Sequence, residues 1–153
     1  MGCDIHLWCE VETVKGTWVP APAVFDADRF EQDWFKTSKI DKPFLWRNYN
    51  MFAFLAGVRN ESGITPIVAP RGLPKEGISS VWVEEYEYDG HSASWLLISE
   101  LLEFDYDRQA DGIHPAGPLT YRQLLPPRYF EQLEQMDSLG DPKHARIVFF
   151  FDN

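Results

Sequence analysis

The chain has 153 residues, of which 44% are hydrophobic and 15% aromatic, and it carries a formal net charge of −10. This length and apolar content predict one globular domain, residues 1–153, while the acidic balance and the lack of a Lys/Arg run disfavour binding to a nucleic-acid duplex. No apolar stretch is long enough to cross a membrane, and no signal-peptide or lipidation pattern follows Met1. We therefore expect a cytoplasmic protein without a membrane anchor.

The first strand is predicted over residues 3–11, because its apolar and polar residues alternate. One face is apolar and holds both cysteines: Cys3, Ile5, Leu7, Cys9 and Val11. The other face is largely polar: Asp4, His6, Trp8, Glu10 and Glu12. The cysteines would lie roughly 20 Å apart along an extended strand, too far for a disulfide, so we expect reduced, buried thiols. A partner strand is predicted over residues 17–19.

Two helices and a long loop follow. Residues 26–36 predict a short helix, and residues 48–58 predict a mostly buried helix capped by Asn48 or Asn50. Residues 59–80 are rich in Gly and Pro and predict a loop of the kind that often carries function.

The middle of the chain predicts a strand, a turn and a helix. Residues 81–88 alternate loosely and favour a strand, and residues 89–92 favour a polar turn. A helix is then expected to begin at Ser92 or Ser94 and to continue through residue 101 or 102, because its apolar residues recur with helical spacing.

The last third predicts a loop, two helices and a closing strand. Residues 104–118 favour a loop, a short helix is expected to open at Thr120, and another covers residues 128–138. Residues 145–151 predict an apolar strand. With an apolar strand at each end, we expect a single α+β domain whose central, mostly antiparallel sheet contains both terminal strands, with short helices and long functional loops.

One hypothesis is that some of the polar residues form a metal site. Asp4 and His6, two residues apart on one strand face, could bind one ion together with His91, and Asp89 could supply a fourth ligand. Metal-bound water would then attack a phosphoryl or carbonyl centre. The sequence leaves open whether the protein holds one divalent metal ion or none.

Acid–base catalysis without a metal is a second reading. His6 held by Asp4, or His91 held by Asp89, could act as a general base near neutral pH. Ser92 and Ser94 lie beside His91, but no nucleophile elbow surrounds them, which favours a capping role.

Recognition of a phosphorylated base is the third reading. Arginine forks at Arg47, Arg59 and Arg71 match phosphate groups, and a helix beginning near Ser92 would offer free N–H groups. Asparagines beside two of these arginines, Asn48 and Asn60, could read base or ribose edges. Rings that could stack a base are Trp46, Tyr49, Trp82, Tyr86 and Trp95.

Five blocks along the chain resemble one family of small, functionally uncharacterised proteins encoded by bacteriophages and prophages. They are Met-Gly-Cys-Asp-Ile-His at 1–6, Arg-Asn-Tyr-Asn-Met-Phe-Ala-Phe-Leu-Ala-Gly-Val-Arg-Asn at 47–60, Arg-Gly-Leu-Pro at 71–74, Asp-Gly-His-Ser-Ala-Ser-Trp-Leu at 89–96 and Arg-Ile-Val-Phe-Phe-Phe-Asp-Asn at 146–153. The resemblance implies a phage setting rather than an activity. In that setting, small proteins sequester or cleave host nucleotide immune signals, such as cyclic dinucleotides or cyclic ADP-ribose forms.

These readings lead to one expected function and two alternatives. We expect a protein that binds a small nucleotide-derived phosphorylated molecule, either to sequester it or to hydrolyse one of its phosphoester or glycosidic bonds. A homo-oligomer is compatible with this function. The first alternative is a metal-dependent phosphohydrolase that uses Asp4, His6 and His91. The second is an acidic protein–protein inhibitor without a small-molecule site.

Overall fold

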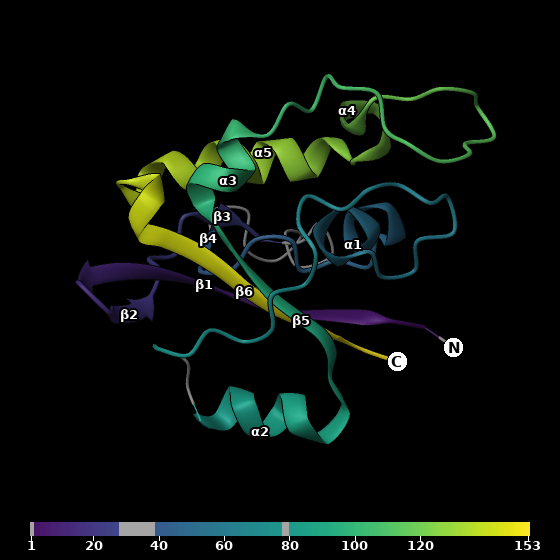
Figure 1. The fold of residues 1–153 in the computed structure, drawn as a ribbon. Coiled ribbons are helices and arrows are strands. Elements are labelled where there is room, and N and C mark those ends of the chain that lie inside the picture. Colours follow the sequence, from purple (N-terminus) through teal and green to yellow (C-terminus); the bar gives the residue numbers. More distant parts are fainter. Residues whose placement is uncertain (1, 28–38, 78–79) are drawn as a thin grey trace.

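A computed structural model describes residues 2–27, 39–77 and 80–153. Its main sheet has the order β2-β1-β6-β5, and each neighbouring pair is antiparallel (Figure 1). The strands of this sheet are β1 (Asp4–Val14), β2 (Thr17–Pro20), β5 (His91–Leu97) and β6 (Ala145–Asp152). The prediction of an α+β fold with both terminal strands in one antiparallel sheet is therefore confirmed.

A second, two-stranded sheet joins β3 (Phe25–Asp26) to β4 (Lys39–Ile40). The helix predicted over residues 26–36 lies almost wholly outside the described residues. Asp26, its first expected residue, belongs to β3.

The helices divide between the two faces of the main sheet (Figure 1). One face packs against α1 (Tyr49–Ala56), α3 (Ile98–Glu103), α4 (Tyr121–Leu124) and α5 (Pro127–Gln135). Two short 3-10 turns, η1 (Met136–Leu139) and η2 (Pro142–His144), lead into β6. The other face is covered by α2 (Ser80–Asp89). Among the described residues, no helix is both long enough and apolar enough to cross a bilayer.

The pairing of β1 with β6 confirms the predicted alternation of β1. It runs from Asp4 opposite Asp152 to Val11 opposite Ala145, so both described ends of the chain lie at one edge of the molecule. The apolar face of β1 belongs to the main core. On the opposite face Trp8 and Glu10 are also buried, because α2 and the loop before it cover that side.

Several predicted helices form where expected. The side chain of Asn48 caps α1 by accepting a hydrogen bond of 2.9 Å from the Met51 N–H, and Gly57 ends the helix in the left-handed region at φ 71°. Thr120 caps α4 in the same way, through the N–H of Gln123 at 3.2 Å. The predicted helix over residues 128–138 is found as α5 followed by η1.

The strand predicted over residues 81–88 is wrong, because this segment is the helix α2. Trp82 and Tyr86 are one helical turn apart and both contact the sheet, Trp82 on Trp8 with ring centroids 4.0 Å apart and Tyr86 on Phe150 at 5.5 Å. Gly90 follows the last residue of α2, at a point where the backbone lies close to the Tyr86 side chain. A Cβ there would lie 2.5 Å from the Tyr86 ring, so the turn into β5 requires glycine.

The helix predicted from Ser92 or Ser94 is also wrong, because residues 91–97 form β5 and the helix α3 begins only at Ile98. Alternate residues of β5 face opposite sides: Ser94 and Leu96 are fully buried, whereas Trp95 packs with the α2 side. Since no helix begins at Ser92, the expected phosphate site at a helix N-terminus there does not form.

The predicted burial of the two cysteines can be tested through the reactivity of their thiols. Cys3 and Cys9 are both free and buried, and burial raises the pKa of Cys9 to about 12 from an ordinary 9.0. In a Cys3→Ala variant at pH 8, the remaining thiol should react with Ellman's reagent about 1,000-fold more slowly in the native protein than in guanidinium. Reaction of the native protein at the rate of the unfolded chain would contradict the buried placement of Cys9.

Candidate functional site

His6 lies on the α2 side of β1, between two carboxylates. Its Nε2 is 2.5 Å from Oδ2 of Asp152, its Nδ1 is 3.7 Å from Oε1 of Glu85, and its ring stacks on Phe150 at 4.8 Å. The predicted pairing of His6 with Asp4 is therefore wrong, because Asp152 from β6 holds the imidazole in its place. Asp152 is opposite Asp4 in the ladder, so only the strand register reveals this partner.

Asp4 is engaged elsewhere. Its Oδ1 accepts a hydrogen bond from Nε of Arg47 at 2.9 Å, and an Nη atom of the same guanidinium lies 2.8 Å from it as an ion-pair contact. The side chains of Asp4 and Arg47 are each about half exposed, so this is a surface ion pair of small energetic value.

His91 lies on the opposite face of the sheet from His6. His6 is paired with Phe150 and His91 with Phe151, and successive residues of a strand point to opposite sides. His91 contacts its neighbour Ser92 at 3.0 Å and Asn153 at 3.3 Å, whereas Asp89 ends α2 as an exposed residue.

Asp4, His6 and His91 are therefore not brought together as metal ligands. Within residues 2–27, 39–77 and 80–153, no group of three or more His, Cys, Asp or Glu side chains is placed to hold a metal ion.

Three further predicted site residues, Tyr49, Arg59 and Asn60, make local contacts around α1. The Tyr49 hydroxyl accepts a hydrogen bond from the Cys3 N–H at 3.3 Å, and Arg59 lies over the Tyr49 ring at 5.6 Å. Asn60 braces the loop after α1 by bonding both the N–H and the carbonyl of Ile64, at 2.9 and 2.7 Å. These contacts give Tyr49 and Asn60 a structural role.

The structure does bring together Arg71, Ser94 and Trp95. The Arg71 N–H donates to the Ser94 hydroxyl at 3.1 Å, and its guanidinium lies 4.6 Å from the centroid of the Trp95 ring. Two guanidinium nitrogens of Arg71 donate to the carboxylate of Glu100, at 2.8 and 2.6 Å. This fork fixes the position of Arg71 beside β5.

A second arginine–tryptophan pair lies nearby, and both pairs line one cavity. Arg146 of β6 lies 4.0 Å from the centroid of the Trp18 ring of β2. It is 5% exposed and donates to the buried carboxylate of Glu10 at 2.8 Å and to the Glu76 carbonyl at 2.8 Å. The strand order β2-β1-β6-β5 thus places the two tryptophans, on β2 and β5, on either side of β1 and β6.

We name the space between these pairs the arginine–tryptophan cavity. Its volume is about 420 Å³, and its lining is Trp18, Arg71, residues 73–76, Trp95 and Arg146. One wall consists of Arg71 and residues 73–76, which belong to the long loop predicted over residues 59–80 and precede α2. A Cβ at Gly77 would lie 2.6 Å from Trp18 and 2.9 Å from the Arg146 guanidinium, so glycine lets the loop approach the second pair closely.

The lining of this cavity is mainly positively charged. Three cations line it, Arg71, Lys75 and Arg146, whereas Glu76 is the one acidic residue in its described lining. The carboxylates of Glu10 and Glu100 hold the arginines from outside that lining. The Arg71 guanidinium lowers the pKa of Glu100, while burial raises the pKa of Glu10 against the opposing effect of Arg146.

Sequence reasoning missed Trp18, Lys75 and Arg146 as site residues. Arg146 had a signal, because it is a charge near the start of a strand that is otherwise apolar, and such a charge needs a buried partner. The partner, Glu10, is on the strand that pairs with β6.

Comparisons with protein-family models, with curated proteins and with solved structures find no match to this chain.

Proposed function

We propose that the chain binds a small phosphorylated molecule with an aromatic base, of the nucleotide class, in the arginine–tryptophan cavity. The observation that supports this most is the gathering of Arg71, Lys75 and Arg146 with two indole rings in one cavity of a chain whose net charge is −10. A volume of about 420 Å³ suits a ligand of this size.

Each group has a distinct part in this binding. Arg71 and Arg146 are held by Glu100 and Glu10, so a phosphate would find guanidinium groups already in place. Lys75 is exposed, and no described residue pairs with its ammonium group, so it is available to close on the phosphate as a point charge. The rings of Trp18 and Trp95 would pack against the base.

Binding without cleavage is the form that the geometry favours. His6, the imidazole held between carboxylates, is on the same face of β1 as Glu10 but roughly 13 Å away along the strand. Between them lies Trp8, whose ring contacts that of Trp82 with the centroids 4.0 Å apart and the planes tilted by 39°. A ligand held beside Arg146 is therefore out of reach of His6, and in the phage setting the protein would sequester a nucleotide signal.

Thermal shift and calorimetry with ADP-ribose and 3′,3′-cyclic GMP-AMP test this proposal. A ligand at 100 times its Kd should add about 2.7 kcal/mol to the free energy of unfolding. Lys75→Gln should weaken binding about tenfold or more, because a charge-assisted contact is lost, whereas Lys143→Gln removes the same charge from an exposed lysine outside this cavity and should leave the Kd unchanged. If neither compound binds, or if both variants weaken binding equally, the proposal is wrong.

A further inference from the structure

The carboxylate of Glu76 differs from the other carboxylates around the arginine–tryptophan cavity. Those of Glu10 and Glu100 are each bound to an arginine of the cavity, at 2.8 and 2.6 Å. Among the described residues, no donor is paired with the carboxylate of Glu76. The residue is exposed, so its carboxylate is the acidic group of the cavity that is open to a ligand.

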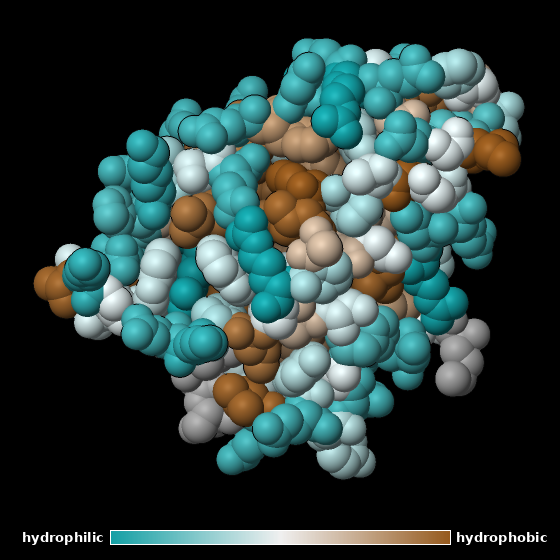
Figure 2. All heavy atoms as spheres, viewed as in Figure 1, coloured by the Kyte–Doolittle hydropathy of each residue, from teal (hydrophilic) through white to brown (hydrophobic). Residues whose placement is uncertain are grey.

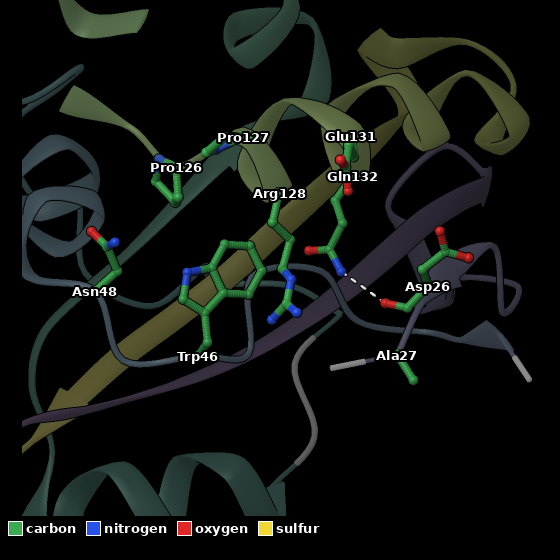
Figure 3. A pocket seen from close by; sticks show the side chains of 9 residues that line it. All are labelled: Asp26, Ala27, Trp46, Asn48, Pro126, Pro127, Arg128, Glu131 and Gln132. Atoms are coloured by element: carbon green, nitrogen blue, oxygen red, sulfur yellow. Dashed lines mark hydrogen bonds between the residues drawn. The ribbon is translucent and has the colours of Figure 1, made fainter. Parts of the chain in front are cut away.

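A carboxylate that lines a cavity is not always open in this way. Figure 3 shows a larger cavity, of about 520 Å³, where α5 faces the segment that leads into α1, and its lining includes Trp46 and Asp26. The Asp26 carboxylate accepts hydrogen bonds from Lys39 and, at 2.8 Å, from Gln135. A ligand would have to displace these donors, whereas no described side chain has to leave Glu76.

The surroundings of Glu76 define where its carboxylate lies. The backbone carbonyl of Glu76 accepts a hydrogen bond from Arg146 at 2.8 Å. A Cβ on Gly16 would lie 3.3 Å from Oε2 of Glu76, so the carboxylate lies beside the turn that joins β1 to β2. The Gly16 N–H is bound to Glu12 at 2.8 Å and is not a donor to Glu76. The carboxylate therefore has a defined position and keeps its capacity to accept hydrogen bonds.

A carboxylate at this position is unfavourable for phosphate but suits hydroxyl groups. When ionised it accepts hydrogen bonds but donates none, and it repels the phosphate group that Arg71, Lys75 and Arg146 attract. In a ligand of the nucleotide class, the donors are the ribose hydroxyls and the amino groups of the base. Two neighbouring ribose hydroxyls can both donate to one carboxylate, and dinucleotide-binding folds use an acidic residue on the ribose in this way.

The neighbours of Glu76 favour the ribose over the base. Lys75 precedes Glu76 in the cavity wall, and Arg146 binds its carbonyl, so groups that attract phosphate lie next to it. In a nucleotide the ribose is bonded directly to the phosphate, and the base is attached on the far side of the sugar. A ligand whose phosphate is held by these cations would therefore bring its sugar to Glu76.

We infer that Glu76 accepts hydrogen bonds from the ribose hydroxyls of the ligand and makes the arginine–tryptophan cavity selective for ribonucleotides. This inference rests on the proposed function, because it assigns one residue of that same site. It adds a specificity that the arginines and the indole rings do not supply, since the phosphate and the base can be identical in a ribonucleotide and in its deoxy analogue.

Calorimetry with ADP and 2′,3′-dideoxy-ADP tests this inference. The wild type should bind ADP more tightly by about tenfold or more, because the dideoxy compound leaves the Glu76 carboxylate without donors. Glu76→Ala should remove this preference, so that the two Kd values agree within about twofold. Glu103→Ala, which removes an exposed glutamate outside the cavity, should keep the preference of the wild type.

The same titrations separate the ribose from the phosphate and from the base. If Glu76 only repels phosphate, the wild type will show no preference and Glu76→Ala will bind both compounds more tightly by one factor, which would overturn the inference. IDP lacks the amino group of adenine, so the ratio of the Kd values for IDP and ADP should be the same in the wild type and in Glu76→Ala. A ratio that changes in this variant would assign Glu76 to the base instead.

The outcome also distinguishes this inference from the proposed function. If ADP-ribose, 3′,3′-cyclic GMP-AMP and ADP all fail to bind, the proposed function is wrong, and the inference with it. If ADP and 2′,3′-dideoxy-ADP bind equally well and Lys75→Gln weakens both, the proposed function stands and the role of Glu76 is wrong. Failure of ADP to bind a protein that binds ADP-ribose would likewise contradict the role of Glu76 alone.

Discussion

Replacing Arg146 with methionine is expected to lower the free energy of unfolding by about 3–5 kcal/mol. Glu10 and Arg146 are 2% and 5% exposed, and the guanidinium Nε lies 2.8 Å from the carboxylate. Methionine keeps much of the apolar stem but leaves the Glu10 carboxylate buried without a cation. Urea denaturation of the wild type and the variant at pH 7.5 measures the difference.

The deficit of this variant should depend on pH with a defined sign. Burial already raises the pKa of Glu10, and loss of the opposing guanidinium raises it further. Between the raised pKa of Glu10 in the wild type and its still higher pKa in the variant, the folded variant keeps a proton that both the folded wild type and the unfolded chain have lost. Its stability relative to wild type should thus fall by about 1.4 kcal/mol per pH unit as the pH rises through that window.

A double variant separates the buried charge from the packing. Glu10→Met combined with Arg146→Met removes both charges, and its free energy of unfolding should return close to that of the wild type. If the double variant is as unstable as Arg146→Met, or if the deficit of the single variant does not change with pH, the ion pair is not what stabilises this part of the sheet.

Replacing Phe54 with alanine should have an effect of similar size, about 3–5 kcal/mol. The side chain is fully buried, and its ring is 5.1–6.0 Å from four others: Phe104, Tyr106, Tyr121 and Tyr129. These rings join α1 to α4, to α5 and to the loop after α3. In a domain of this size the melting temperature should fall by roughly 6–20 °C.

The control for Phe54 is an exposed ring. Tyr88 on α2 is 92% exposed, so Tyr88→Ala should change the free energy of unfolding by less than about 0.5 kcal/mol. Hydrophilic side chains cover most of the face seen in Figure 2, and the apolar ones form separate small patches. Equal effects of the two substitutions would contradict the placement of the core on the α1 side of the sheet.

The sequence predicted well those elements whose local signals agree with their environment. Apolar residues alternate with mostly polar ones in β1 because one face meets the main core and the other meets the smaller α2 side, and β6 is almost entirely apolar because both of its faces are covered. Asn48 and Thr120 are side-chain caps whose chemistry is local to their own helices. These features could be read without knowledge of the fold.

The secondary structure of residues 81–97 could not be predicted from the local sequence. The valines and aromatic residues of α2 favour a strand, but Trp82 and Tyr86 gain more by packing side by side on Trp8 and Phe150. The opposite occurs in β5, whose apolar spacing imitates a helix while Ser94 and Leu96 are buried beside β6. In both cases tertiary packing outweighs local preference.

The candidate site was predictable only in part, for the same reason. Arg71, Ser94 and Trp95 carried chemical signals of their own, and the structure places them together. Their proposed partners across the sheet, Trp18 and Arg146, depend on strand order and register. Neither can be deduced from a single sequence when the strands are far apart in the chain.

Titration of indole-¹⁵N-labelled protein with ADP-ribose tests the nucleotide proposal most directly. The tryptophans that line the arginine–tryptophan cavity can be compared there with a tryptophan that lies outside it. We expect the N–H signals of Trp18 and Trp95 to shift in a saturable manner, while that of Trp46 stays unchanged. Trp8, whose Nε1 is buried and has no hydrogen-bond partner among the described residues, serves as an internal reference. If Trp18 and Trp95 do not move at saturating ADP-ribose, or if only Trp46 moves, the arginine–tryptophan cavity is not the binding site.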